Sequence, residues 1–185
     1  MDTKSHEARE IKIVKFIMVT ILLAAIFFMG KGYINKQKLS KHRENIQVAF
    51  DATKYINYTN GKASLCSPID VEKAMGEPES KEDWTYKGSK GNFLLTTYAY
   101  DGGKYEFTFY LIDLVRITIN DNFTFSDKDD IPYMFGLKKY KNTYSKDTGY
   151  AIRFSNTGIK DLWVSGIEGN SFDMAKITYA SGIFD

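Results

Sequence analysis

The stretch NFLLTTYAYDGGKYEFTFYL, residues 92–111, decides the fold class. Its two halves are rich in Phe, Tyr and Thr with a period of two, and the Asp-Gly-Gly at 101–103 has the chemistry of a hairpin turn. Stretches of similar composition flank it at 83–87 and 114–120. This pattern predicts an antiparallel sheet.

A short helix is predicted immediately before these strands, over residues 67–76. Ser67 is a favoured N-cap residue, Pro68 suits the first helical position, and Gly76 suits the C-terminal end. Pro78 lies just beyond and cannot continue the helix. The chain therefore enters the sheet from a capped helix.

The same order of elements recurs further along the chain. Residues 130–136 again combine an acidic cap, a proline near the start and a terminal glycine, and two strands follow, joined by the turn SNTG at 155–158. The sequence predicts an α+β domain over residues 63–185, built from two helix-plus-β-hairpin repeats at about 67–120 and 130–180.

Three motifs carry a resemblance to a known family. VEKAMGEP at 71–78 is followed by WTYKG at 84–88 and LLTTYAYDGGKYEF at 94–107. This order resembles the beta-lactamase-inhibitor-protein-like (BLIP-like) superfamily, which includes small outer-membrane-assembly lipoproteins. The resemblance covers about residues 67–180 and implies an α+β fold, often doubled, that binds another protein on its sheet face. The lipoprotein cysteine is absent, and an apolar segment stands in its place.

That apolar segment, IVKFIMVTILLAAIFFMGKGY at 13–33, predicts a transmembrane anchor behind a short tail at 1–12. Its uninterrupted part spans roughly 22 Å as a helix, and flanking lysines extend it toward the roughly 30 Å hydrocarbon core by laying their stems along the lipid. A cleaved signal peptide is an alternative, although no small-x-small site follows; a buried helix is another. Residues 34–62 are expected to form a juxtamembrane helix, through residue 56, and a linker.

Orientation and charge bear on the partner. Lysine and arginine counts beside the anchor slightly favour a cytoplasmic C-terminus, but long domains are exported largely regardless of charge, so we expect the domain outside a bacterial cytoplasmic membrane. From residue 46 onward, sixteen basic residues face nineteen acidic ones. This mildly acidic domain is not expected to bind nucleic acid.

The sequence gives no sign of an enzyme. His6 and His42 lie outside the predicted domain, and Cys66, the only cysteine, has no histidine near it in sequence to activate it. We therefore expect no catalytic residue and no cofactor.

A calcium loop is the metal site to consider, because Asp127, Asp129 and Asp130 resemble its opening. The position that requires glycine is Pro132, and the position that requires glutamate is Lys138. No metal is expected, and Asp130 is predicted to cap the following helix.

Binding of a protein partner through the sheet is the favoured function. Tyr98, Tyr100 and Tyr110 are candidates for an aromatic protein-binding surface, with ordinary cross-strand packing as the alternative. The expectation is a membrane-anchored, non-catalytic module in the bacterial envelope. The alternatives are a bitopic subunit of a conjugation or type IV secretion channel with a nuclear-transport-factor-like domain, and a sensor of a small envelope ligand.

Overall fold

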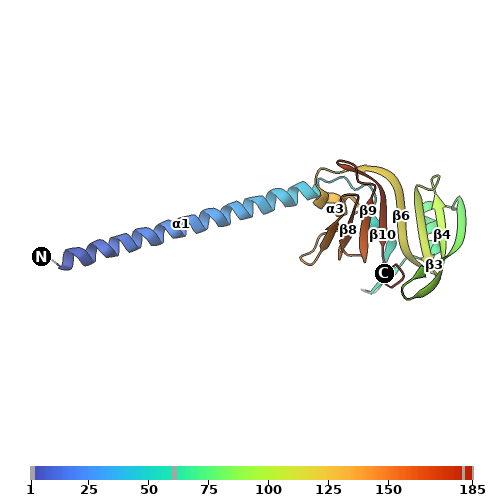
Figure 1. The fold of residues 1–185 in the computed structure, drawn as a ribbon, viewed down its shortest axis with the longest axis horizontal. Coiled ribbons are helices and arrows are strands. Elements are labelled where there is room, and N and C mark those ends of the chain that lie inside the picture. Colours follow the sequence, from blue (N-terminus) through green and yellow to red (C-terminus); the bar gives the residue numbers. More distant parts are fainter. Residues whose placement is uncertain (1–2, 60–61, 181, 185) are drawn as a thin grey trace. The chain divides into compact units, whose positions relative to one another are not determined.

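A computed structural model describes residues 3–59, 62–180 and 182–184. The chain divides between Ile46 and Gln47 into two units, and each is described by itself. The first unit is one continuous helix, α1 (Thr3–Glu44), which ends in a turn of basic residues that complements the helix dipole (Figure 1).

The side chains of residues 13–17, 19, 22, 23 and 32, a large part of the predicted anchor, lie outside what the structure describes. Within the described residues, no helix is both long and apolar enough to cross a membrane. The described apolar side chains of α1 are exposed on successive positions, with Phe27 at 59 % and Phe28 at 71 %.

The second unit is a mixed α+β fold around a large antiparallel sheet, as the sequence predicts. Its helical elements are η1 (Ala52–Tyr55), α2 (Pro68–Met75), η2 (Lys128–Asp130) and α3 (Ile131–Met134). A separate two-stranded hairpin consists of β1 (Ile56–Thr59) and β2 (Lys62–Leu65). The predicted Asn60-Gly61 turn lies outside the described residues.

The large sheet has eight strands in the order β3-β4-β5-β6-β10-β9-β8-β7 (Figure 1). Four strands follow α2: β3 (Ser80–Gly88), β4 (Gly91–Tyr100), β5 (Tyr105–Tyr110) and β6 (Asp113–Thr124). Four follow α3: β7 (Tyr144–Asp147), β8 (Ala151–Ser155), β9 (Asp161–Ser165) and β10 (Ser171–Thr178). Each set is a meander of neighbouring strands, and the two sets join through their last strands, β6 and β10.

The α2 helix forms where its capping residues predict. Asp70 N–H donates to Ser67 Oγ at 3.3 Å, and Ser67 N–H donates back to Asp70 Oδ2 at 2.9 Å, which completes a capping box. Gly76 ends the helix at a positive φ of 87°, a backbone conformation that favours glycine.

The helix predicted through residue 56 is wrong beyond Glu44. Ala49 N–H instead donates to Met134 O at 2.8 Å, and the short η1 begins at Ala52 after its N-cap, Asp51. Ala52 and Tyr55 are buried in the domain. Their packing outweighs the local helical preference of the sequence.

The main core lies on one face of the sheet, which we call the core face. A row of directly paired residues crosses five strands there, and all are at most 1 % exposed: Phe107, Ile117, Ile177, Leu162 and Phe154. Helical elements of the domain cover this face. Tyr55 of η1 lies 5.1 Å from Phe107 between ring centres, and Glu72 of α2 pairs with Lys81 at 2.8 Å.

The opposite face, which we call the polar face, carries charged residues, hydroxyls and tryptophans. Ala180, Ile183 and Phe184 of the C-terminal segment pack over part of it, where Ile183 shares a buried cluster with Leu95 and Val115. The remainder of this face contains the candidate site.

Candidate functional site

The structure does not bring Tyr98, Tyr100 and Tyr110 together. Tyr98 is paired with Phe107 and Tyr100 with Tyr105, which puts both on the core face, whereas Tyr110 is paired with Leu95 on the polar face.

Tyr100 is only 4 % exposed, and its ring packs edge-on against Phe107 at 5.6 Å. Its side chain is therefore not available to a partner in the folded domain. Tyr98 is half-buried between the Phe109 ring and the Lys81 ammonium, at 5.1 and 4.6 Å from its ring centre. The predicted tyrosine surface is therefore wrong.

The length of the β4–β5 loop explains this error. A three-residue loop, Asp101–Gly103, would place Tyr110 on the same face as Tyr98. The loop has four residues, because β5 begins at Tyr105 and pairs it with Tyr100. A register change of one residue moves every side chain of a strand to the other face.

A groove of ≈ 510 Å³ crosses the polar face from β3 to β10. Its lining mixes carboxylates, hydroxyls, an amide, two cationic side chains and an indole; the members used below are Glu82, Trp84, Thr97, Glu106, Arg116 and Lys176. Their strands all belong to the one sheet, so hydrogen-bonded backbone fixes their spacing.

The β3–β5 side of the groove is held by a chain of hydrogen bonds. Trp84 Nε1 donates to Thr97 Oγ1 at 2.9 Å, and the Thr97 and Thr108 hydroxyls lie 3.1 Å apart. These bonds orient the Trp84 indole in the groove wall. Glu106, paired across from Thr118, accepts a 3.5 Å bond from the Asn120 amide.

Arg116 on β6 forms the opposite wall. Its Nε donates to Thr178 Oγ1 at 3.4 Å, and its guanidinium carbon lies 3.3 Å from the centre of the Phe184 ring. Burial, with a smaller contribution from Arg153, lowers the pKa of Arg116 to about 10, although Asp161 and Tyr86 oppose the shift.

Lys176 on β10 lies beside Arg116, between Thr118 on β6 and Trp163 on β9. Its ammonium is 5.8 Å from the centre of the Trp163 ring. Burial and the Arg116 charge lower the pKa of Lys176, and Glu106 opposes the shift. Within the described part of the chain, neither Arg116 nor Lys176 forms an ion pair.

The polar face continues beyond the groove toward β8. Arg153 is paired across from Trp163, and its Nε donates to the buried Asp161 carboxylate at 2.8 Å. Trp163 is 45 % exposed although β9 is an interior strand, with β10 on one side and β8 on the other.

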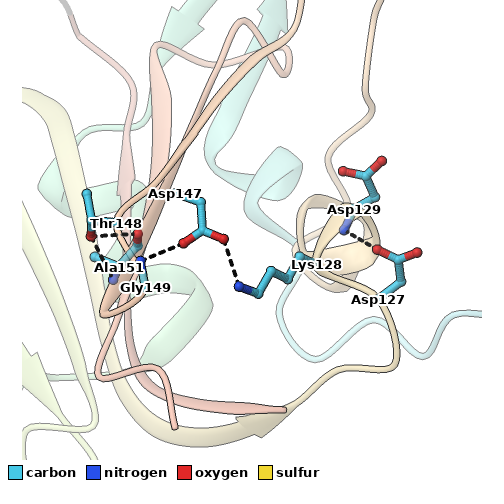
Figure 2. Close-up of polar contacts among 7 residues, drawn as sticks. All are labelled: Asp127, Lys128, Asp129, Asp147, Thr148, Gly149 and Ala151. Carbon is cyan, nitrogen blue, oxygen red and sulfur yellow. Dashed lines mark hydrogen bonds and ion pairs between the residues drawn. The ribbon is translucent and has the colours of Figure 1, made fainter. Parts of the chain in front are cut away.

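The acidic cluster at 127–130 makes local contacts, among them a hydrogen bond to its own backbone (Figure 2). The Asp127 carboxylate accepts a 2.9 Å bond from Asp129 N–H, and Lys128 reaches Asp147 at 2.7 Å, next to the turn before β8. Asp129 pairs with Lys139 at 2.7 Å.

Asp130 occupies the predicted N-cap position of α3, but its side chain makes no capping hydrogen bond there. Among the residues that the structure describes, no group of three His, Cys, Asp or Glu side chains could hold a metal ion.

Sequence reasoning missed Arg116, Lys176 and Trp163 as a set. The signal that could have found Arg116 and Lys176 is the alternation within RITIN at 116–120 and AKIT at 175–178, where polar residues interrupt strands of otherwise apolar character. Such strands predict one buried and one polar face. The pairing of β6 with β10, from Thr124 with Ser171 to Arg116 with Thr178, does not follow from that alternation.

Neither protein-family models nor curated protein sequences nor solved structures match this chain at a significant level.

Proposed function

We propose that the chain is a membrane-anchored, non-catalytic module that binds a partner protein of the bacterial cell envelope through the polar face of its sheet. The domain acts on the outer side of the cytoplasmic membrane. The binding surface differs from the tyrosine surface that the sequence suggested, because Arg116, Lys176 and Trp163 lie on the face opposite to Tyr98 and Tyr100.

The exposure of Trp163 carries this proposal. A large aromatic side chain that is 45 % exposed on an interior strand offers apolar area which a partner could cover. Arg153 and Lys176 flank it on the neighbouring strands. Tryptophan and arginine are the residue types that contribute most to the energy of protein interfaces.

The arrangement of the sheet supports a doubled unit of the BLIP-like kind. Each half supplies a short helix followed by a four-stranded meander, and the halves meet at β6 and β10. A single cone of one long helix on a curved sheet, expected for a secretion-channel subunit, has no such pair of halves. The strand order therefore favours the binding module over that alternative.

The anchor, residues 13–33, belongs to the same proposal and rests on the sequence. The run from Phe16 to Gly30 is apolar apart from Thr20. The consecutive exposed side chains of Phe27, Phe28 and Met29 show that the apolar surface is not confined to one stripe. A lipid bilayer would cover such a surface.

The binding proposal is tested by photo-crosslinking in cells that express the full chain. A photoreactive phenylalanine replaces Trp163, and the matched control carries it at Ile69, which is 63 % exposed on α2 beside the core face. A discrete crosslinked protein is expected from position 163 only. The same products from both positions, or none from position 163, would overturn the proposal.

The orientation is tested by thiol labelling of intact cells. Tyr150→Cys places a thiol at a position 68 % exposed, and the unmodified chain is the control because its one cysteine, Cys66, is buried. A membrane-impermeant reagent is expected to label the variant without lysis. Labelling only after lysis would place the domain in the cytoplasm.

A further inference from the structure

We infer that the partner protein presents a carboxylate side chain, Asp or Glu, to the groove on the polar face, where Arg116 and Lys176 bind it together. This inference rests on the proposed function and names the chemistry of the partner at that same surface. It rests on the placement and the charge of these two residues.

The register puts the two cations side by side. Arg116 is paired with Thr178, and Thr118, two residues along β6, is paired with Lys176. Arg116 and Lys176 are thus diagonal neighbours on adjacent strands and project from the same face. Both line one groove. A single carboxylate with two oxygens can accept hydrogen bonds from a guanidinium and an ammonium at once.

Arg116 is held in place before any ligand arrives. The Phe184 ring lies over its guanidinium, and Thr178 accepts a hydrogen bond from its Nε. Within the described residues, these contacts leave the two terminal guanidinium nitrogens without a hydrogen-bond acceptor. Because the side chain is already ordered, a carboxylate can bind without a large loss of side-chain entropy.

Arg116 and Lys176 lack a direct ion pair in the described chain, although the carboxylates of Glu82 and Glu106 line the same groove. The two cationic groups are half-buried and lie close enough for the Arg116 charge to lower the pKa of Lys176, and the nearby Asp161 and Glu106 offset the cost of burial only in part. Such burial raises the free energy of both charges, and an incoming anion would lower it. This is the complementarity that an acidic partner would supply.

The groove also discriminates among anions. Glu82 and Glu106 line its other side, and Glu106 is paired with Thr118 beside Lys176. A phosphate with nearly two negative charges would be repelled by these carboxylates more strongly than a singly charged carboxylate. The exposed Trp163 ring next to Lys176 supplies apolar contact for neighbouring side chains of a polypeptide. These features favour an acidic protein segment over a phosphate.

The experiment uses the full chain in a nonionic detergent, with two peptides of alternating sequence as probes: blocked (Glu-Ala)3 and its neutral match (Gln-Ala)3. The chain has two tryptophans, Trp84 in the groove wall and Trp163 beside it. Their indole N–H signals in a nitrogen–proton NMR spectrum therefore report on this face alone. Inorganic phosphate is titrated separately.

The acidic peptide is expected to shift both indole signals saturably, and the glutamine peptide is not. Arg116→Gln and Lys176→Gln should each weaken binding by about two- to fivefold, the loss expected for one charge pair. Lys87→Gln, an exposed lysine of β3 on the core-face side, should leave binding unchanged. Arg116→Lys should restore part of the binding, which separates loss of charge from loss of structure.

Two results would overturn the inference. One is an equal response to both peptides, or a stronger response to phosphate. The other is a crosslink from position 163 that persists at wild-type yield in the Arg116→Gln, Lys176→Gln double variant. That second result would leave the proposed binding function intact and contradict only the inference that a partner carboxylate binds Arg116 and Lys176. Absence of any crosslink from position 163 would instead remove the function on which the inference rests.

Discussion

The Phe184 ring lies over the guanidinium of Arg116, with 3.3 Å between the ring centre and the guanidinium carbon. The two residues are 68 positions apart, and their contact fastens the C-terminal segment to the polar face. Phe184 also lies 5.1 Å from the Tyr86 ring, measured between ring centres. The last residues described thus help to form the second, smaller core of the domain around Leu95 and Ile183.

Phe184→Ala is expected to lower the free energy of unfolding by about 1–2 kcal/mol. The change removes a partly buried ring and a cation–π contact, each worth roughly 1 kcal/mol. Urea unfolding followed by circular dichroism measures the difference. Tyr150→Ala removes a ring that is 68 % exposed and should cost less than about 0.5 kcal/mol. Equal losses in the two variants would show that the C-terminal segment contributes nothing specific.

Local structure could be predicted from the sequence wherever it depends on the chemistry of neighbouring residues. The α2 helix has the predicted cap at Ser67 and the predicted end at Gly76, because capping bonds form within one turn of chain. The Asp101–Gly103 turn also lies where expected, since glycine tolerates the positive φ found at Gly102 and Gly103.

The candidate site could not be predicted, because it depends on pairing between distant strands. Lys104 is the fourth residue of the β4–β5 loop. This one additional loop residue places Tyr110 on the polar face, opposite to Tyr98. The groove requires β6 beside β10, a pairing set by packing of the two halves and by no local pattern. The end of α1 at Glu44 likewise has no local signal, whereas Ala52 and Tyr55 further along are buried in the core of the domain.

Gly136→Ala is expected to destabilise the domain by about 2 kcal/mol or more. Gly136 has a φ of 69°, and an added Cβ would lie 2.5 Å from Asp51 Oδ1. That oxygen cannot move aside freely because it accepts bonds from the Thr53 N–H and hydroxyl, at 3.1 and 2.6 Å. The cost combines left-handed backbone strain with a steric clash.

Gly149→Ala is the matched control for this change. Gly149 has a similar φ of 84°, but nothing lies within 4 Å of the added Cβ. This substitution should lower the free energy of unfolding only by the left-handed backbone strain, about 1 kcal/mol. Thermal unfolding of both variants measures the difference, and a Gly149 variant as unstable as the Gly136 variant would refute the role of Asp51.

Tyr100→Phe and Tyr179→Phe should have opposite effects, although each removes one hydroxyl. The buried Tyr100 hydroxyl has no hydrogen-bond partner among the residues that the structure describes, so its loss should be neutral or stabilise the domain by up to about 1 kcal/mol. The Tyr179 hydroxyl donates to Ala52 O at 2.8 Å, and its loss leaves a carbonyl unpaired, at a cost of about 1–2 kcal/mol. Urea unfolding at neutral pH compares the two. Equal losses would contradict the assignment of their partners.

Stability should fall at high pH because of Tyr55. Burial, reinforced by Cys66, raises the pKa of Tyr55 to about 12, whereas a tyrosine in the unfolded chain titrates near 10. Between those values the unfolded chain releases the proton and the folded chain keeps it, so the free energy of unfolding decreases as pH rises from about 10 to about 12. Below pH 10 Tyr55 is protonated in both states, and its full contribution to the free energy of unfolding is present.

Tyr55→Phe isolates this contribution, since phenylalanine keeps the ring that packs on Phe107 and cannot titrate. The variant should lose less stability than the wild-type chain over the same pH interval, measured by urea unfolding at half-unit steps. Burial also holds the pKa of Tyr179 well above its ordinary value, so the variant should retain some decrease and the double variant with Tyr179→Phe should retain less. Parallel curves for wild type and Tyr55→Phe would mean that Tyr55 ionises equally in both states, contrary to its place in the core.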